Sequence, residues 1–211
     1  NGCTFEELDV ALMMHGGPAT QVDVKSLANS KYKVIFHGVS SHAAIRPEKG
    51  RSALDGLILA FQGIEFLREH VNSDVKIHYT VVNCGGTPAN VVPAYAEASV
   101  YVRSYNRAYL DTVCRRFEKV LKGAAMMTET ELEIEFLGGC YNTQNNHVLA
   151  GVVAEAMNEI PQEPWTQEEL DFAAALDEQT ADAARATTKK YGLSADTHLY
   201  TGPGQVTCFN S

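Results

Sequence analysis

The sequence predicts an α+β domain with a ferredoxin-like fold, a four-stranded antiparallel sheet that carries two helices on one face. Three observations lead to this prediction. Apolar and polar residues alternate in four segments, as in strands with one buried face, near residues 31–39, 75–81, 96–103 and 131–136. Apolar residues recur at helical spacing in two segments, over residues 51–71 and 110–124. The resulting order, βαββαβ, leaves little choice of topology because crossovers are right-handed.

A polar turn joins the first predicted strand to the first predicted helix. Tyr32, Val34 and Phe36 supply the strand face that is to be buried. The helix then places its apolar residues three or four positions apart, at Leu54, Leu57, Ile58, Phe61, Ile64 and Leu67. The strand 31–39 has no proline, and we expect it to lie at an edge of the sheet, where unpaired backbone groups invite pairing with a second copy.

A stiff loop separates the second and third strands. Two glycines and two prolines in Gly85-Gly86-Thr87-Pro88-Ala89-Asn90-Val91-Val92-Pro93 predict a connection of fixed geometry. Such a loop can present the amide of Asn90 as a hydrogen-bonding group at the rim of the sheet. The alternative is a plain hairpin loop, in which Asn90 only tolerates an unusual backbone angle. Both interpretations are open at this point.

The second helix and the last strand complete the domain. Asp111 lies near the start of the helix, as the helix dipole favours. In the last strand Glu131, Glu133 and Glu135 alternate with apolar residues, and we expect these glutamates to form a solvated face of the sheet.

The segment before this domain has a different character. Residues 10–14 form a short apolar run that predicts a fully buried strand of a parallel sheet. His15 follows at the carboxyl end of that strand, where open α/β sheets bind their ligands. A lone histidine at a strand end is more often a polar terminus than a metal ligand, so its pattern alone does not identify a site.

The segment after the domain is predicted to be helical. One helix covers residues 148–160, and a second opens with the capping-box pair Thr166 and Glu169 and runs to about Tyr191. His147 and His198 have no recognisable partner pattern. We therefore expect an inserted domain at 26–138, between flanks at 1–25 and 139–211 that belong to another unit.

Composition excludes several classes of protein. The net charge of −9 over 211 residues argues against a nucleic-acid-binding function, and no apolar stretch is long enough to predict a membrane helix. Five widely spaced cysteines suit reduced thiols and a cytoplasmic location better than a disulfide framework. The chain does not begin with Met, and we expect it to be part of a longer protein.

Six spaced motifs together resemble one family, the two-metal amidohydrolases that comprise aminoacylases, glutamate carboxypeptidases and bacterial aminobenzoyl-glutamate hydrolases. The resemblance runs from about residue 5 to residue 140 and is thinner beyond. The matching stretches are Ala11-Leu12-Met13-Met14-His15, Gly38-Val39-Ser40-Ser41-His42-Ala43-Ala44, Gly50-Arg51-Ser52-Ala53-Leu54-Asp55, Gly85 to Pro93, Tyr101-Val102-Arg103 and Gly123 to Thr130.

This resemblance implies a role for four residues. The inserted domain would be a lid and dimerisation domain, and the protein would hydrolyse the amide bond of N-acyl amino acids, such as aminobenzoyl-glutamate, or of dipeptides. His15 matches a metal ligand, and His42 matches a lid histidine that reaches the partner subunit's active site and polarises the scissile carbonyl. Asn90 and Arg103 match lid groups that hold the carboxylate of the substrate, as an amide donor and a guanidinium fork can.

The resemblance also implies a divalent metal, with zinc favoured and manganese or cobalt as alternatives, and a homodimer formed through the lid. Only His15 of the family's metal ligands is present, so we expect this chain to be inactive alone and to bind no metal stably. The competing interpretation is a non-enzymatic ferredoxin-like module that binds a small molecule or regulates a partner.

Overall fold

The computed structural model describes residues 8–15, 21–86, 88–160, 164–176 and 207–208. The chain forms two compact units. One comprises residues 25–144, and the other comprises residues 1–24 together with 145–211. The predicted domain boundary at residue 138 falls inside the last strand of the first unit, which continues to Cys140.

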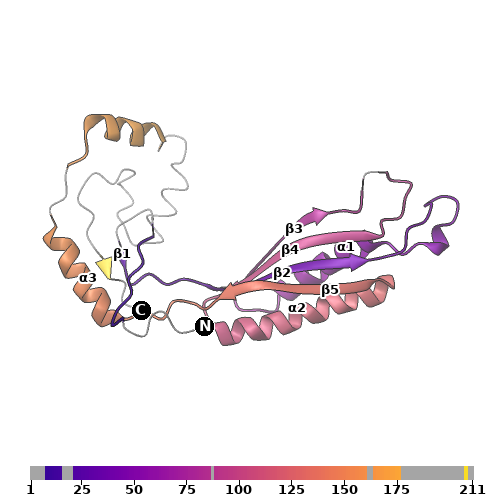
Figure 1. Ribbon diagram of the computed structural model, residues 1–211, viewed down its shortest axis with the longest axis horizontal. Helices are drawn as coiled ribbons and strands as arrows, with labels where there is room; N and C mark the ends of the chain where they lie inside the picture. The colour runs from indigo at the N-terminus through magenta and orange to yellow at the C-terminus, as the bar shows by residue number, and fades with distance from the viewer. Residues whose placement is uncertain (1–7, 16–20, 87, 161–163, 177–206, 209–211) are drawn as a thin grey trace. The chain divides into compact units, whose positions relative to one another are not determined.

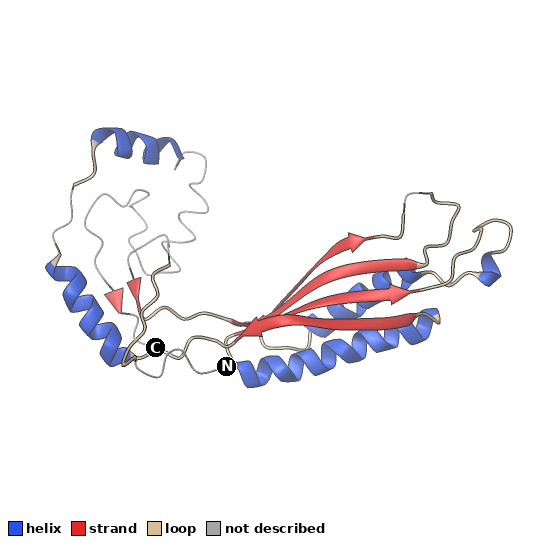
Figure 2. Cartoon of the chain, in the orientation of Figure 1, coloured by secondary structure: helices blue, strands red, loops and turns tan. Residues whose placement is uncertain are grey.

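Unit 25–144 contains the predicted four-stranded antiparallel sheet (Figures 1 and 2). The strands are β2 (Ala28–His37), β3 (Lys76–Asn83), β4 (Tyr95–Ser104) and β5 (Glu131–Cys140), in the spatial order β3-β4-β2-β5. The helices α1 (Ala53–Arg68) and α2 (Arg107–Thr128) both cover the same face. The α+β class and the βαββαβ arrangement are therefore confirmed.

The expectation that the first strand lies at an edge is wrong. β2 is central and pairs along its length with β4 on one side and β5 on the other. The reason is that the two βαβ units interleave, which brings the first and third strands to the middle of the sheet. The edges are therefore β3 and β5.

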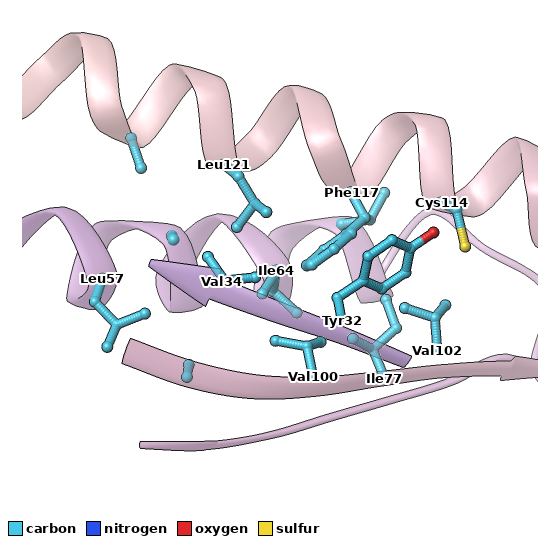
Figure 3. Close-up of a cluster of buried hydrophobic side chains, with 14 of the residues drawn as sticks. Tyr32, Val34, Leu57, Ile64, Ile77, Val100, Val102, Cys114, Phe117 and Leu121 are labelled. Carbon is cyan, nitrogen blue, oxygen red and sulfur yellow. The ribbon is translucent and has the colours of Figure 1, made fainter. Parts of the chain in front are cut away.

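The core lies between the helices and the sheet (Figure 3). Val34 and Val100 project from the sheet toward Leu57 and Ile64 of α1 and toward Phe117 and Leu121 of α2. All six are at most 1% exposed. Phe117 also stacks at a tilt on Tyr32, with ring centroids 5.4 Å apart. The period-two pattern of the strands and the period-3.6 pattern of the helices thus meet in one apolar layer.

Capping residues fix where the two helices begin and end. The side chains of Ser52 and Asn106 accept hydrogen bonds from the backbone N–H groups of Asp55 and Tyr109, which satisfies one free donor at the start of each helix. At the end of α2, Glu129 adopts the left-handed conformation (φ 52°), and its N–H bonds back into the last turn.

The prediction of a buried strand at residues 10–14 is wrong. Residues 8–15 form no strand, and Leu12, Met13 and Met14 are exposed, Met14 by 94%. A strand that is apolar on both faces needs paired strands and covering layers, and within the described residues no strand pairs with this segment.

The remaining described elements are short. β1 (Gln21–Val22) pairs in parallel with β6 (Thr207–Cys208), and α3 covers His147–Glu159. A further helix at residues 167–176 begins with the predicted capping box, since Thr166 and Glu169 exchange backbone and side-chain hydrogen bonds. The predicted end of that helix near Tyr191 lies outside the described residues.

Candidate functional site

His42 and Asn90 lie next to each other at one end of the sheet. The antiparallel pairing of β2 with β4 continues beyond the strands, so that the loop after β2 runs beside the loop before β4. His42 forms a bridge with Val91, and the N–H of Ala43 donates to the carbonyl of Asn90 at 2.9 Å. Two loops that are far apart in sequence therefore form one paired tip.

Backbone hydrogen bonds fix the tautomer of the neutral His42 ring. The N–H groups of Ala44 and Ile45 point at its Nδ1, at 3.2 and 3.3 Å. Because a backbone N–H can only donate, Nδ1 is the acceptor, and in the neutral ring the proton must be on Nε2. The His42 side chain is exposed, so this Nε2–H is available as a donor to a ligand.

The same tip is braced against the start of α1. Val39 and Arg51 exchange two backbone hydrogen bonds of 2.8 and 2.9 Å, and Arg51 forms an ion pair with Glu129 at 2.8 Å. A Cβ at Gly38 would lie 2.0 Å from the carbonyl oxygen of Arg51, so glycine is required for this approach.

Arg103 lies at the other end of the sheet. It is opposite Asn29 and Lys76, while Tyr95 at the start of β4 is opposite His37. Arg103 lies eight positions after Tyr95 along β4, which corresponds to about 26 Å. Within one chain Arg103 therefore cannot contact the same small substrate as His42 and Asn90.

The Arg103 end is also where the domain joins the rest of the chain. β2 begins and β5 ends there, with Asn29 opposite Cys140. Ser26 and Thr143 continue this pairing through side-chain and backbone hydrogen bonds. The tip with His42 and Asn90 is thus the end of the domain that is remote from both connections.

His15 does not assemble a metal centre with other described residues. It is exposed and follows the irregular segment described above. In the described part of the chain no group of three or more His, Cys, Asp or Glu side chains could hold a metal ion. The described residues alone therefore do not make up a two-metal site.

One polar pair was missed by the sequence analysis. The Asp23 side chain is only 3% exposed, and its Oδ2 lies 2.6 Å from His147 Nδ1, while Asn145 donates to the Asp23 carbonyl. Asp23 has the left-handed backbone conformation (φ 64°), and its Oδ1 is buried without a hydrogen-bond partner among the described atoms. No local sequence signal marks this pair, because its residues are 124 positions apart.

The helix-free face of the sheet carries most of the polar side chains, and we call it the open face. In its half nearer the tip, acidic groups are paired: Lys33 with Glu135 at 2.6 Å, His37 with Glu133 at 3.2 Å, and the Tyr95 hydroxyl with Glu97 at 2.6 Å. The Glu135 hydrogen bond raises the pKa of Lys33, and the Glu97 hydrogen bond raises the pKa of Tyr95. Two of the three predicted glutamates thus have a partner on this face, Glu135 in an ion pair with Lys33 and Glu133 in a contact with His37.

The buried thiol of Cys114 and an apolar groove lie away from the four predicted site residues. Cys114 is buried, and burial raises the pKa of its thiol, which makes it a poor nucleophile. A groove of about 700 Å³ lies between α2 and β5 and is lined by Tyr32, Glu118, Lys122, Ala125, Met126, Leu132, Ile134 and Phe136. It contains none of the four predicted site residues.

Comparison with known proteins gives a consistent picture. Residues 28–127 match the M20 peptidase dimerisation domain. The chain is 35% identical over 173 residues to a subunit of the p-aminobenzoyl-glutamate hydrolase of Escherichia coli, and the match covers 82% of this chain and 36% of the relative. It is 30% identical over 152 residues to the Xaa-Arg dipeptidase of Mus musculus, and that match covers 72% of this chain and 35% of the relative.

A solved structure supports the same grouping. The aminobenzoyl-glutamate utilization protein from Klebsiella pneumoniae superposes with a TM-score of 0.57 at 30% identity, over 69% of this chain and 38% of that protein. The chain spans little more than a third of the length of these relatives. No helix among the described residues is long and apolar enough to cross a membrane.

Proposed function

The chain belongs to the M20 amidohydrolase family through its dimerisation domain, and on this basis we propose that it is the lid and dimerisation part of an enzyme that hydrolyses N-acyl amino acids or dipeptides. Enzymes of this family are metal-dependent. We propose zinc, with manganese or cobalt as alternatives, held by residues that include His15. The flanks 1–25 and 139–211 would belong to the catalytic domain.

The large distance between the site residues within one chain is the observation that supports a site shared by two copies. His42 and Asn90 are at the remote tip, and Arg103 is at the end from which both connections leave. We propose that two copies form a homodimer about a two-fold axis. The tip of one copy then meets the Arg103 end of the other, and each substrate is held by both.

Each residue would have a defined chemical task at such a shared site. The Nε2–H of His42 donates a hydrogen bond to the oxygen of the scissile carbonyl. This hydrogen bond becomes stronger as negative charge develops on that oxygen in the transition state. Arg103 provides a guanidinium fork for the substrate carboxylate, and the Asn90 side chain adds an amide donor from the tip.

The β3 edge suits the two-fold contact. From Ile77 to Asn83 this strand carries no acidic or lysine side chain, and the apolar side chains of Val81 and Val82 are 45% and 57% exposed. The neighbouring helix adds Ile58, which is 47% exposed. Antiparallel pairing of two β3 strands would satisfy the backbone groups of both edges and cover this apolar surface.

The β5 edge suits it less well. Two β5 strands paired about a two-fold axis would bring the rows of Glu131, Glu133 and Glu135 opposite each other, and like charges across strands are destabilising. The strand is also interrupted by a register shift near Gly138, whose φ is +125°.

A complementation experiment on the full-length protein tests the shared site. The single variants His42→Ala and Arg103→Ala should each be nearly inactive, with Arg103→Ala raising the barrier in kcat/KM by about 1.5–3 kcal/mol. When the two variants are unfolded together and refolded, half of the dimers are mixed. Each mixed dimer has one intact site, so activity should return to about a quarter of the wild-type value.

The control is a refolded mixture of His42→Ala with Asn90→Ala. Both changes affect the same tip, so every site of a mixed dimer lacks one of the two groups, and no activity should return. Recovery in this control, or no recovery in the first mixture, would contradict the shared site.

We also propose that the protein is located in the cytoplasm. The described cysteines Cys84, Cys114 and Cys140 are free thiols, which suits the reducing environment of the cytoplasm.

A further inference from the structure

Arg103 belongs to a cluster of five residues on the open face, which comprises Lys31, Lys76, His78, Tyr101 and Arg103. Tyr101 and Arg103 alternate along β4, so their side chains point to the same face. Lys31 of β2 and His78 of β3 lie directly opposite Tyr101, and Lys76 lies directly opposite Arg103. Residues opposite each other in antiparallel strands have neighbouring side chains.

Tyr101 lies at the centre of this cluster. The ammonium of Lys31 is 5.3 Å from the centroid of its ring, and the guanidinium of Arg103 is 5.4 Å from it. Both are cation–π contacts, which orient the cations without neutralising them. The ring thus holds two positive groups close together.

Within the residues that the structure describes, no salt bridge neutralises the cationic groups of the cluster, and the carboxylate that acts electrostatically on Lys76 is that of Asp74. Among the described residues Lys31, Lys76 and Arg103 form no ion pair, whereas Lys33 on the same face is paired with Glu135. Lys76 donates only to the backbone carbonyl of Ser73, at 2.7 Å. The carboxylate in the turn before β3, Asp74, accepts hydrogen bonds from Ser104 Oγ and Tyr105 N–H at 2.7 and 3.0 Å.

This accumulation stands out in a chain of net charge −9. Unpaired like charges within one patch repel each other, so the cluster lowers stability unless an anion occupies it. One guanidinium is sufficient for one carboxylate. The two additional ammonium groups therefore indicate a second negative group on the ligand.

We propose that Lys31 and Lys76 form a second anion subsite beside Arg103, which selects substrates whose released amino acid is dicarboxylic. This inference rests on the proposed function. Arg103 holds the α-carboxylate, and the two lysines take the side-chain carboxylate. An amino acid with a cationic side chain would be repelled by the same cluster, which separates this chain from relatives that act on Xaa-Arg dipeptides.

Paired substrates test the subsite in the full-length protein. N-acyl-glutamate and N-acyl-glutamine have nearly the same shape and differ in the side-chain charge. Lys31→Met and Lys76→Met should each lower kcat/KM for the glutamate substrate by about tenfold and leave the glutamine substrate unchanged. Arg103→Met should impair both substrates equally, because both carry the α-carboxylate.

Lys33→Met is the matched control, since it removes a lysine from the same strand and face outside the cluster. It should leave the ratio of glutamate to glutamine hydrolysis unchanged. An unchanged ratio in both Lys31→Met and Lys76→Met would overturn the subsite while leaving the proposed amidohydrolase intact.

A binding measurement separates the two proposals. Titration of the 211-residue chain with N-acetyl-glutamate should shift nuclear magnetic resonance signals of Lys31, Lys76 and Tyr101, and N-acetyl-glutamine should shift them much less. If the full-length protein hydrolyses no N-acyl amino acid while these shifts are seen, the proposed function fails and the anion site stands. Equal or absent shifts for the two ligands would contradict the subsite whatever the activity.

Discussion

The two faces of the four-stranded sheet differ in what their side chains contribute. On the helix-covered face the side chains of the sheet, such as Phe36, Val34 and Val100, are fully buried beneath the two helices, and their burial stabilises the fold. On the open face the polar side chains are half-buried or exposed, and their ion pairs contribute little to stability. The open face is therefore free to carry charges that serve binding, as we propose for the cluster around Tyr101.

The largest expected effect on stability comes from truncating a side chain in the core between the helices and the sheet. Phe117 is 0% exposed and packs on Tyr32, so Phe117→Ala should lower the free energy of unfolding of unit 25–144 by about 3–5 kcal/mol. Urea unfolding followed by circular dichroism measures this. Lys33→Ala on the open face is the control and should cost less than about 1 kcal/mol. Similar losses in both variants would contradict the division between the two faces.

Two helical glycines compare the inner and outer sides of the helical layer. A Cβ on Gly56 would lie 2.6 Å from Phe36 Cδ1, so Gly56→Ala should destabilise by about 1–3 kcal/mol through overpacking. A Cβ on Gly123 would meet nothing within 4 Å, so Gly123→Ala should stabilise by about 0.5–1 kcal/mol, because alanine favours the helix. Thermal unfolding should move in opposite directions. A shift in the same direction would show that the helices pack differently.

The smallest expected effect concerns Asp74, in the turn before β3. Hydrogen bonds from Ser104 and from the Tyr105 N–H lower the pKa of this carboxyl group. A lowered native pKa contributes stability that is fully present above the unfolded value of about 3.9 and is lost as the pH falls through the native pKa.

The measurement is the free energy of unfolding between about pH 2 and pH 7 for the wild type and for Asp74→Asn. The variant should be slightly less stable near neutral pH, and its stability should fall less steeply in the acid range below the unfolded pKa. Parallel curves for the two proteins would exclude Asp74 as a contributor to acid sensitivity.

Much of the fold could be predicted because it depends on local patterns. Alternation in Tyr32, Val34 and Phe36 identifies a strand and its buried face, and this holds wherever the strand lies in the sheet. Position in the sheet is a different matter. The same alternation would suit an edge strand, which is why the central place of β2 could not be derived from its own residues.

The candidate site was predictable only in part for a similar reason. Motifs point to His42, Asn90 and Arg103 one by one, but their distances depend on pairing across the sheet. The contact of His42 with the Asn90 loop and the separation of Arg103 follow from the register of β2 with β4. The apolar run 10–14 shows the opposite case, since its pattern predicts a strand that needs neighbours to form.

The pairing of Asn29 with Cys140 brings both ends of unit 25–144 to adjacent strands. A single step across the ladder, about 5 Å, separates the point where the chain enters from the point where it leaves. Such a unit can be inserted into a surface loop of a host protein without changing the distance between the ends of that loop by much. The geometry of one strand pair thus makes unit 25–144 suited to insertion into another protein as a single segment.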